Sequence, residues 1–297
     1  MFDLRYHVAS LAAVFIALII GIVVGVGISG KGFVSDSERS LFNERIADLK
    51  SRLDSATKRD TDLVREQKAA QAFVQDAYPA LMAGRLQGTS SGIVFAGPID
   101  GRVRSQVEQA LSDAGAGQPV RVRALKLPID PPALRRALAG HPALAALATQ
   151  KRIGDLGRRL GAEMVAGGDS PLWQLLSAQL VEERSGNDKP PLDGVVIGRS
   201  VPPQSGATAR FLAGFYAGLG SQGVPAVGVE MTRPGGKSAV EPFAKQDLAT
   251  VDDVDSQAGR LAVALLLAGA DPGQYGVKKS AHDGVLPPIP ATAPAGG

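Results

Sequence analysis

Residues 8–28 read VASLAAVFIALIIGIVVGVGI, a run of 21 residues without a charged side chain. A helix of this length spans about 30 Å, the thickness of the hydrocarbon core of a bilayer. The alternative is a signal peptide, and Gly25-Val26-Gly27 resembles its cleavage site, but its apolar region would be only about 7–15 residues long. The length therefore favours an uncleaved transmembrane anchor over residues 1–31. Basic residues flank both ends of the run, so charge leaves its orientation open.

Small residues recur at every fourth position of this anchor: Ala9, Ala13, Ala17, Gly21, Gly25 and Ser29. Such a stripe lets two membrane helices approach closely. We therefore expect Gly21 and Gly25 to contact a second copy of the chain. Ala and Gly are also common in membrane helices that make no such contact, and this alternative stays open.

A charged helix is predicted directly after the anchor, over residues 32–83. It begins with the capping box Ser35-Asp36-Ser37-Glu38, in which side chains of the first turn bond backbone N–H groups. No Gly or Pro interrupts it before Pro79, which is predicted to end it. Oppositely charged residues at the favourable i,i+4 order predict the ion pairs Asp48/Arg52 and Asp54/Lys58.

Apolar residues repeat at every seventh position of this helix, as the core of a coiled coil requires. The d positions are Phe42, Leu49, Ala56, Leu63, Ala70 and Ala77, and the a positions are Ile46, Leu53, Asp60, Gln67, Val74 and Leu81. Asp60 and Gln67 interrupt the seam, which weakens a coil but can fix its register and number of strands. We predict a parallel homodimer through residues 42–77. The alternative is a single amphipathic helix folded against its own domain.

An α/β domain is predicted over residues 84–274, after a linker at 84–92. Its short apolar runs predict strands at 93–96, 120–125, 195–197 and 224–229, of which 120–125 alternates and is expected to be more exposed. Helical patterns fall at 103–114, at 134–166 with breaks, and at 169–183, 207–220 and 252–268. Alternating strands and helices indicate an α/β fold, a small and mainly parallel sheet covered by helices on both faces. Residues 275–297 are rich in Gly, Pro and Ala, which predicts a disordered tail.

Composition excludes several classes of function. The chain contains no Cys, which rules out disulfides, zinc ribbons, iron–sulfur clusters and thiol nucleophiles. Its 32 Lys and Arg residues nearly balance 29 Asp and Glu residues, and this disfavours nucleic acid as a partner.

Polar residues that follow the predicted strands are the candidates for chemistry, because ligands of such sheets bind beyond the carboxyl ends of the strands. Asp100, Arg199 and Glu230 occupy these places. We favour loop solvation and a salt bridge over a polar site. Gly235-Gly236-Lys237-Ser238 resembles the end of a phosphate loop, but Met231 stands where the first Gly belongs. We predict no enzymatic activity, catalytic residue or cofactor.

Soft-metal ligands are few and scattered, and no pair of them has ligand spacing. They are His7, His141, His282, Met82, Met164 and Met231. The residues therefore predict no metal site within one chain.

Four segments carry a resemblance to a known family. They are MFDLRYHVASLAAVFIALIIGIVVG at the start, GIVFAGPIDG at the first strand, and the late VDDVDSQAGRLAVALLLAG and QYGVKKSA. Together they resemble the actinobacterial MctB family. The resemblance implies a role in copper efflux and tolerance, a location in the cell membrane, a cytoplasmic N-terminus, and an extracytoplasmic coil and domain. It assigns no metal ligand.

Two functional hypotheses follow, and they make different physical demands. Copper transport, which the resemblance implies, needs a polar pathway across the bilayer, and the small-residue stripe offers only Ser29 and the nearby Ser10. SteB-type relatives instead imply a non-enzymatic scaffold in envelope division or in regulation of cell-wall hydrolases, with a second envelope protein as partner. A scaffold needs an anchor, a spacer, a dimer seam and a presenting domain, and the residues themselves favour it.

Overall fold

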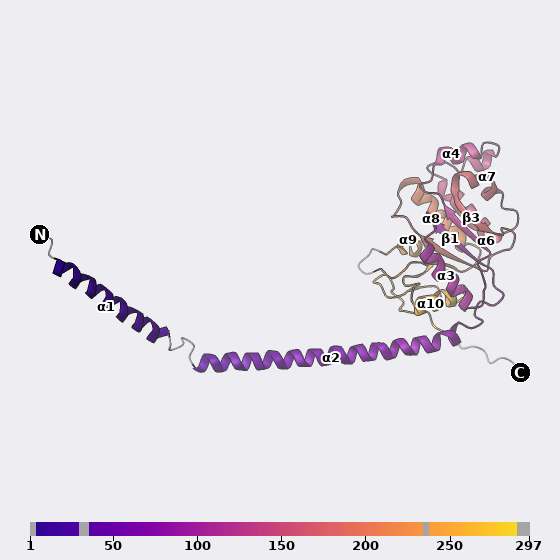
Figure 1. Cartoon of the computed structure of the whole chain (residues 1–297). Helices are drawn as coiled ribbons and strands as arrows, with labels where there is room; N and C mark the ends of the chain where they lie inside the picture. The colour runs from indigo at the N-terminus through magenta and orange to yellow at the C-terminus, as the bar shows by residue number, and fades with distance from the viewer. Residues whose placement is uncertain (1–3, 30–35, 234–237, 290–297) are drawn as a thin grey trace. The chain divides into compact units, whose positions relative to one another are not determined.

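The computed structural model of the chain describes residues 4–29, 36–233 and 238–289. The chain divides into two compact units, Met1–Ala70 and Gln71–Gly297 (Figure 1). The second unit begins before the boundary predicted at residue 84. The reason is that Tyr78 and Met82, at the end of the long helix, are buried in the core of the α/β domain.

Helix α1 (Leu4–Ser29) contains the predicted anchor. Within the described part of the chain, it is the one helix long and apolar enough to cross a membrane, over Val8–Gly27. Its side chains from residue 8 to residue 27 are all exposed. Ser35 lies outside the described residues, so the predicted capping box does too.

Helix α2 (Asp36–Met82) has 47 residues, which corresponds to about 70 Å. Pro79 lies inside this helix, so the prediction that it ends the helix is wrong. A proline in the last turn removes a single N–H, and the Ala83 N–H donates to the Pro79 carbonyl (3.0 Å) to close the next turn. The predicted pair of Asp48 and Arg52 forms at 2.9 Å, whereas no ion pair joins Asp54 to Lys58, both of which are described.

Seven strands form one sheet in the order β3-β2-β1-β4-β5-β6-β7. Each neighbouring pair is parallel except β2 and β3, which are antiparallel. The predicted mainly parallel sheet is therefore confirmed. The strands are β1 (Ser91–Ala96), β2 (Arg121–Leu125), β3 (Val181–Gly186), β4 (Gly194–Arg199), β5 (Ala226–Val229), β6 (Ala249–Val251) and β7 (Gln274–Tyr275).

Helices cover both faces of this sheet, as predicted (Figure 1). Alternation along β1 directs Val94 to one core and Ile93 and Phe95 to the other. The first core holds the residues of α4 (Pro131–Ala137), α5 (Pro142–Ala145), α6 (Ile153–Ala166), α7 (Pro171–Leu180), α8 (Gly206–Gly220) and α9 (Glu241–Ala244). The second holds those of α3 (Gly101–Asp113), α10 (Gln257–Leu267) and the end of α2.

Strand β2 is fully buried, which corrects the prediction of an exposed strand at 120–125. It lies between β1 and β3, and β3 was not predicted because its residues, VEERSG, are mostly polar. Helix α7 consequently ends at Leu180, before the predicted end at residue 183. Its first turn is capped by the Glu163 carboxylate, which accepts from the Leu172 N–H (3.2 Å).

Two boundaries near the C-terminus also differ from the prediction. Helix α10 begins at Gln257 rather than at residue 252, because Ser256 caps it through the Gly259 N–H (2.8 Å). Residues from 275 onward were predicted to be a disordered tail, yet Tyr275 lies in β7 and Leu286 packs against the second core. The domain thus includes at least residues 275–286. The linker predicted at 84–92 likewise ends early, because β1 begins at Ser91.

Helices α6 and α8 touch backbone to backbone. A methyl group on Gly214 would lie 2.7 Å from the carbonyl carbon of Gly154, and one on Gly161 would lie 2.8 Å from the Leu219 nitrogen. Glycine is required here because any side chain would force the helices apart. This contact fixes α8 over the sheet.

Candidate functional site

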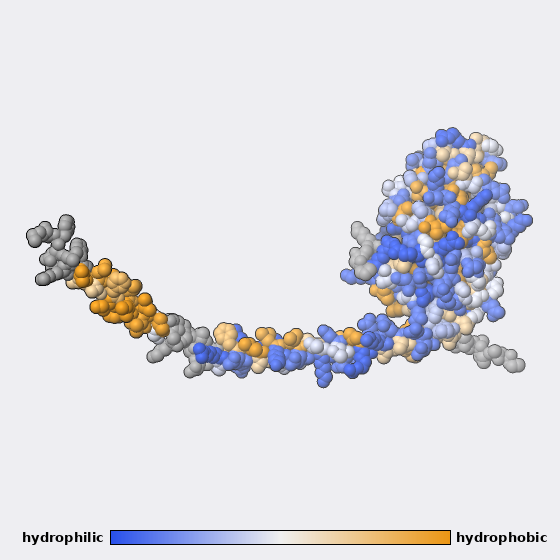
Figure 2. All heavy atoms as spheres, in the orientation of Figure 1, coloured by the Kyte–Doolittle hydropathy of each residue, from blue (hydrophilic) through white to orange (hydrophobic). Residues whose placement is uncertain are grey.

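The predicted dimer interface lies on the surface of α2. We call ten positions the α2 seam: Phe42, Ile46, Leu49, Leu53, Ala56, Asp60, Leu63, Gln67, Ala70 and Val74. All ten are exposed, and the six large apolar side chains among them are 39–66% exposed. Figure 2 shows apolar and charged side chains lying together along this helix. An exposed apolar row of this length is typical of an interaction surface.

The end of α2 is already occupied. Leu81 is partly buried against the second core of the domain, together with the buried Tyr78 and Met82. The Tyr78 hydroxyl donates to Asp113 (2.7 Å), and the Arg260 guanidinium lies 5.6 Å from the centre of its ring. The part of the helix available to a partner therefore stops near Val74.

Gly21 and Gly25 lie on α1 with open space beside them. No atom of the described chain comes within 4 Å of a methyl group placed on either residue. Their contact with a second copy stays a prediction.

The crevice between β1 and β4 is the expected ligand site of this sheet, because the strand order reverses there. It is closed. A methyl group on Gly97, which has a φ of +103°, would lie 2.8 Å from Ser200 Oγ and closer to Val201. The Asp100 carboxylate already caps α3, accepting from the N–H groups of Arg102 (3.0 Å) and Val103 (3.3 Å). A phosphate would therefore meet a carboxylate at this helix N-terminus.

Asp100, Arg199 and Glu230 are not brought together as one site. Asp100 lies 3.9 Å from the Arg233 guanidinium, whereas Glu230 pairs with Lys278 at 2.8 Å. Both carboxylates thus have a cationic partner, as the predicted salt bridge requires, but Glu230 is buried rather than solvated in a loop. Of the phosphate-loop-like segment, residues 235–237 lie outside the described part of the chain.

A buried polar cluster occupies the carboxyl ends of β5, β6 and β7. The Lys278 ammonium donates to Glu230 and to the Met231 carbonyl (2.9 Å), and the Ser238 hydroxyl donates to Glu230 (2.8 Å). The Ser280 hydroxyl donates to Asp252 (2.9 Å), whose carboxylate also accepts from backbone N–H groups at 277 and 278. These bonds tie the segment after β7 to the sheet, so the cluster has a structural role.

Asp253 lies beside this cluster. Burial is the main cause that raises the pKa of its carboxyl group. One carboxylate oxygen accepts from the Ser256 hydroxyl (2.7 Å), and the other is buried against Gly259 without a hydrogen-bond partner in the described chain. Because Ser256 caps α10, this bond connects Asp253 to the start of that helix.

Two buried arginines on β2, Arg121 and Arg123, were not predicted from the sequence. The Arg121 guanidinium donates to the Met164 carbonyl (2.6 Å), and that of Arg123 donates to the Ser185 carbonyl (2.8 Å) and pairs with Asp188. Burial is the main cause that lowers the pKa of Arg123 to about 10. Both side chains fasten β2 to neighbouring segments.

The His and Met residues considered as soft-metal ligands lie in different parts of the structure. Across the described ranges, no group of three or more His, Asp or Glu side chains could hold a metal ion. Met82 and Met164 lie in opposite cores, and His141 and His282 are exposed in loops. The His7 side chain is outside the description.

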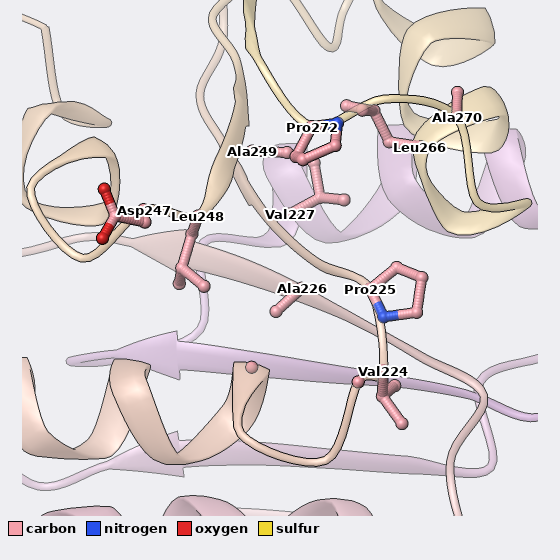
Figure 3. Close-up of a pocket in the computed structure, with 12 residues that line it drawn as sticks. Val224, Pro225, Ala226, Val227, Asp247, Leu248, Ala249, Leu266, Ala270 and Pro272 are labelled. Atoms are coloured by element: carbon pink, nitrogen blue, oxygen red, sulfur yellow. The ribbon is translucent and has the colours of Figure 1, made fainter.

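One cavity of about 290 Å³ lies near the amino ends of β5 and β6. Figure 3 shows that its labelled side chains are mostly aliphatic or proline, with the Asp247 carboxylate at one edge of the group. A pocket with so few polar groups offers little to orient a ligand.

These features define a class of protein: an α/β domain attached to a long charged helix with an exposed heptad seam, preceded by an apolar helix long enough to span a membrane. The chain belongs to the family described as copper transport outer membrane protein, MctB, whose sequence model matches residues 1–287. The resemblance seen in the sequence is therefore confirmed. The description of this family is that of a membrane transport protein. No curated protein matches the chain.

Proposed function

We propose that this chain acts in copper efflux and tolerance as a single-pass, membrane-anchored protein that dimerises in parallel through the α2 seam. Membership of the MctB family supports the role in copper. Helix α1 supports the anchor, because its apolar span Val8–Gly27 has 20 residues and is long enough to cross a bilayer. The same segment also has the length and composition of a signal sequence, so the anchor is part of the proposal.

The exposed α2 seam is the observation that carries the dimer. Leu49 and Leu53 are 64% and 66% exposed, and such side chains gain stability when they are buried against a second helix. Two copies inserted into a membrane in the same direction extend from it in parallel. Asp60 and Gln67, at a positions, then each face the same residue of the second copy, and polar residues at such positions favour one register and one number of strands.

The proposed topology places the N-terminus in the cytoplasm and the coil and domain outside the cell membrane. Family resemblance supports this orientation, because the charges that flank α1 do not decide it.

The part played in copper efflux is indirect. Cu(I) prefers Cys and Met sulfur, and the chain has no Cys, while Met82 and Met164 are buried in separate cores. Close packing beside Gly97 fills the crevice between β1 and β4, where this kind of sheet usually binds a ligand. We therefore propose that the dimer supports a second envelope protein that handles the metal.

A scaffold in envelope division or cell-wall hydrolase regulation is the second candidate. The observation that favours it is the combination of an exposed seam with a polar cluster, around Glu230 and Lys278, whose members bond one another. Such a protein contributes surfaces rather than chemistry.

One set of strains tests both candidates. A deletion strain would be complemented with the intact chain, with Leu49→Gln/Leu53→Gln, or with Leu41→Gln. Leu41 is an exposed leucine of α2 that lies outside the seam. Copper accumulation and cell-chain morphology would be scored together.

We expect the seam variant to fail and the Leu41 variant to complement. Excess copper without a division defect would favour efflux, whereas chained cells with normal copper would favour the scaffold. Full complementation by the seam variant would refute the role of the dimer.

A further inference from the structure

A second cavity, of about 320 Å³, lies where β4 ends beneath α8 and α9. Its walls combine aliphatic and proline side chains with polar ones, among which Arg199 and Lys245 carry positive charge and Gln204 and Gln246 are neutral amides. The lining includes Arg199, Leu212, Ala213, Tyr216, Pro242 and Lys245.

Tyr216 packs closely against its neighbours at this cavity. Its side chain is 2% exposed, and its ring packs edge-on against Phe243 with 4.9 Å between ring centres. Phe243 in turn fills the space over Gly228, where a methyl group would lie 2.6 Å from the ring carbon Cγ and closer still to Cδ2. The Tyr216 hydroxyl has no hydrogen-bond partner in the described chain. Burial raises the pKa of this phenol, so it stays a neutral donor.

Arg199 supplies the second unused donor. It is the last residue of β4, and its buried Nε–H has no partner within the described ranges. Its side chain lines the same cavity as that of Tyr216. Buried donors are normally paired, so two of them at one cavity call for an acceptor that the chain does not provide.

We propose that this cavity binds a small molecule that carries an oxyanion, a carboxylate or a phosphate, on a short apolar body. The oxyanion pairs with the Arg199 guanidinium, which lines the cavity, because charge-assisted hydrogen bonds to arginine are the strong ones. A shift of the two side chains lets it accept from Arg199 Nε–H and the Tyr216 hydroxyl, which are both covered in this structure. Leu212, Ala213 and Pro242 contact the apolar body. Lys245 is engaged by Glu241 (2.7 Å), so Arg199 is the main source of charge.

Isothermal titration calorimetry of the full chain in lipid nanodiscs tests this proposal, with empty nanodiscs as the blank. The probes are hexanoate, hexyl phosphate, 1-hexanol and inorganic phosphate, each up to about 20 mM. We expect at least one of the two hexyl anions to bind, and the tighter one identifies the headgroup. Hexanol lacks the anionic group, and inorganic phosphate lacks the apolar body. Each should therefore bind at least about tenfold more weakly than the preferred hexyl anion.

Three variants locate the site. Arg199→Gln should weaken the preferred anion about tenfold or more, and Tyr216→Phe should weaken it severalfold. Arg210→Gln removes the same charge from α8, at a residue that instead bonds Gln150 (2.9 Å), and should change nothing. Tyr216→Phe also controls for folding, because removing an unpaired buried hydroxyl should leave the thermal midpoint equal or higher.

The proposal is overturned if neither hexyl anion binds, if hexanol binds as well as both, or if Tyr216→Phe and Arg199→Gln bind like the intact chain. The α2 seam variants leave this cavity intact. Their failure to dimerise would therefore not change the calorimetric result.

Discussion

Replacing Gly214 with alanine should strongly destabilise the α/β domain, because α6 and α8 touch through their backbones. The new methyl carbon would lie 2.7 Å from the Gly154 carbonyl carbon and 2.9 Å from its Cα. Carbon atoms pack at about 3.5–4.0 Å, so the helices must separate by roughly 1 Å. Overpacking costs about 1–3 kcal/mol, and we expect about 3 kcal/mol, because a backbone cannot rotate away as a side chain can. For a domain of this size the midpoint should fall by about 6–12 °C.

The fluorescence of Trp173, the single tryptophan, measures this change at the right place. Its indole N–H donates to the Leu160 carbonyl on α6 (3.0 Å), and its ring lies 6.0 Å from that of Phe215 on α8. Gly101→Ala is the matched control, since a methyl group there meets no atom within 4 Å and alanine favours the helix. Its midpoint should be equal or higher. A Gly214→Ala chain that melts with the intact one would refute the backbone contact.

Three further predictions concern charge, the coil and copper. Lys278→Met should cost about 3 kcal/mol in thermal unfolding, because it leaves the buried Glu230 carboxylate without its ammonium partner, whereas Lys279→Met at the exposed neighbour should cost little. Equal losses for both would contradict the buried pair. Replacing Asp60 and Gln67 with Leu should raise the melting temperature of the coil, and a lower one would mean that the heptad register is misassigned. The chain without its apolar helix should bind no Cu(I) at submicromolar affinity in competition with a chelator; tight binding abolished by one His or Met substitution would restore direct transport.

Local sequence patterns were sufficient to predict the elements in which apolar residues form a continuous run or recur at a regular spacing. The apolar run of α1 and the uninterrupted heptads of α2 predict their helices from spacing alone. The same holds for β4, whose Val195-Val196-Ile197 is buried between β1 and β5. Strand β6 has three residues, too few for any pattern, and its place depends on pairing with β5.

Burial of charged residues could not be predicted in this way. Arg121 and Arg123 alternate with valine and alanine, which resembles an exposed strand, but β3 and the following loop supply carbonyl and carboxylate partners from distant sequence. The candidate cavity could not be predicted from local sequence patterns either. The position of Arg199 after a strand was visible in the sequence, whereas a tyrosine on an apolar helix is typical of a core. The significance of Tyr216 lies in the partner it lacks, which only the packed structure reveals.

Disulfide crosslinking through the α2 seam tests the central claim, parallel dimerisation, most directly. The chain has no native Cys, so Leu49→Cys introduces a single thiol at a d position and Leu41→Cys a single thiol outside the seam. Facing d residues of a parallel coil approach closely enough for a disulfide, whereas side chains on the outer surface do not. Oxidation of the full chain in membranes should convert Leu49→Cys, and not Leu41→Cys, into a covalent homodimer. A Leu49→Cys chain that stays monomeric, or equal crosslinking of both variants, would contradict a dimer built on this seam.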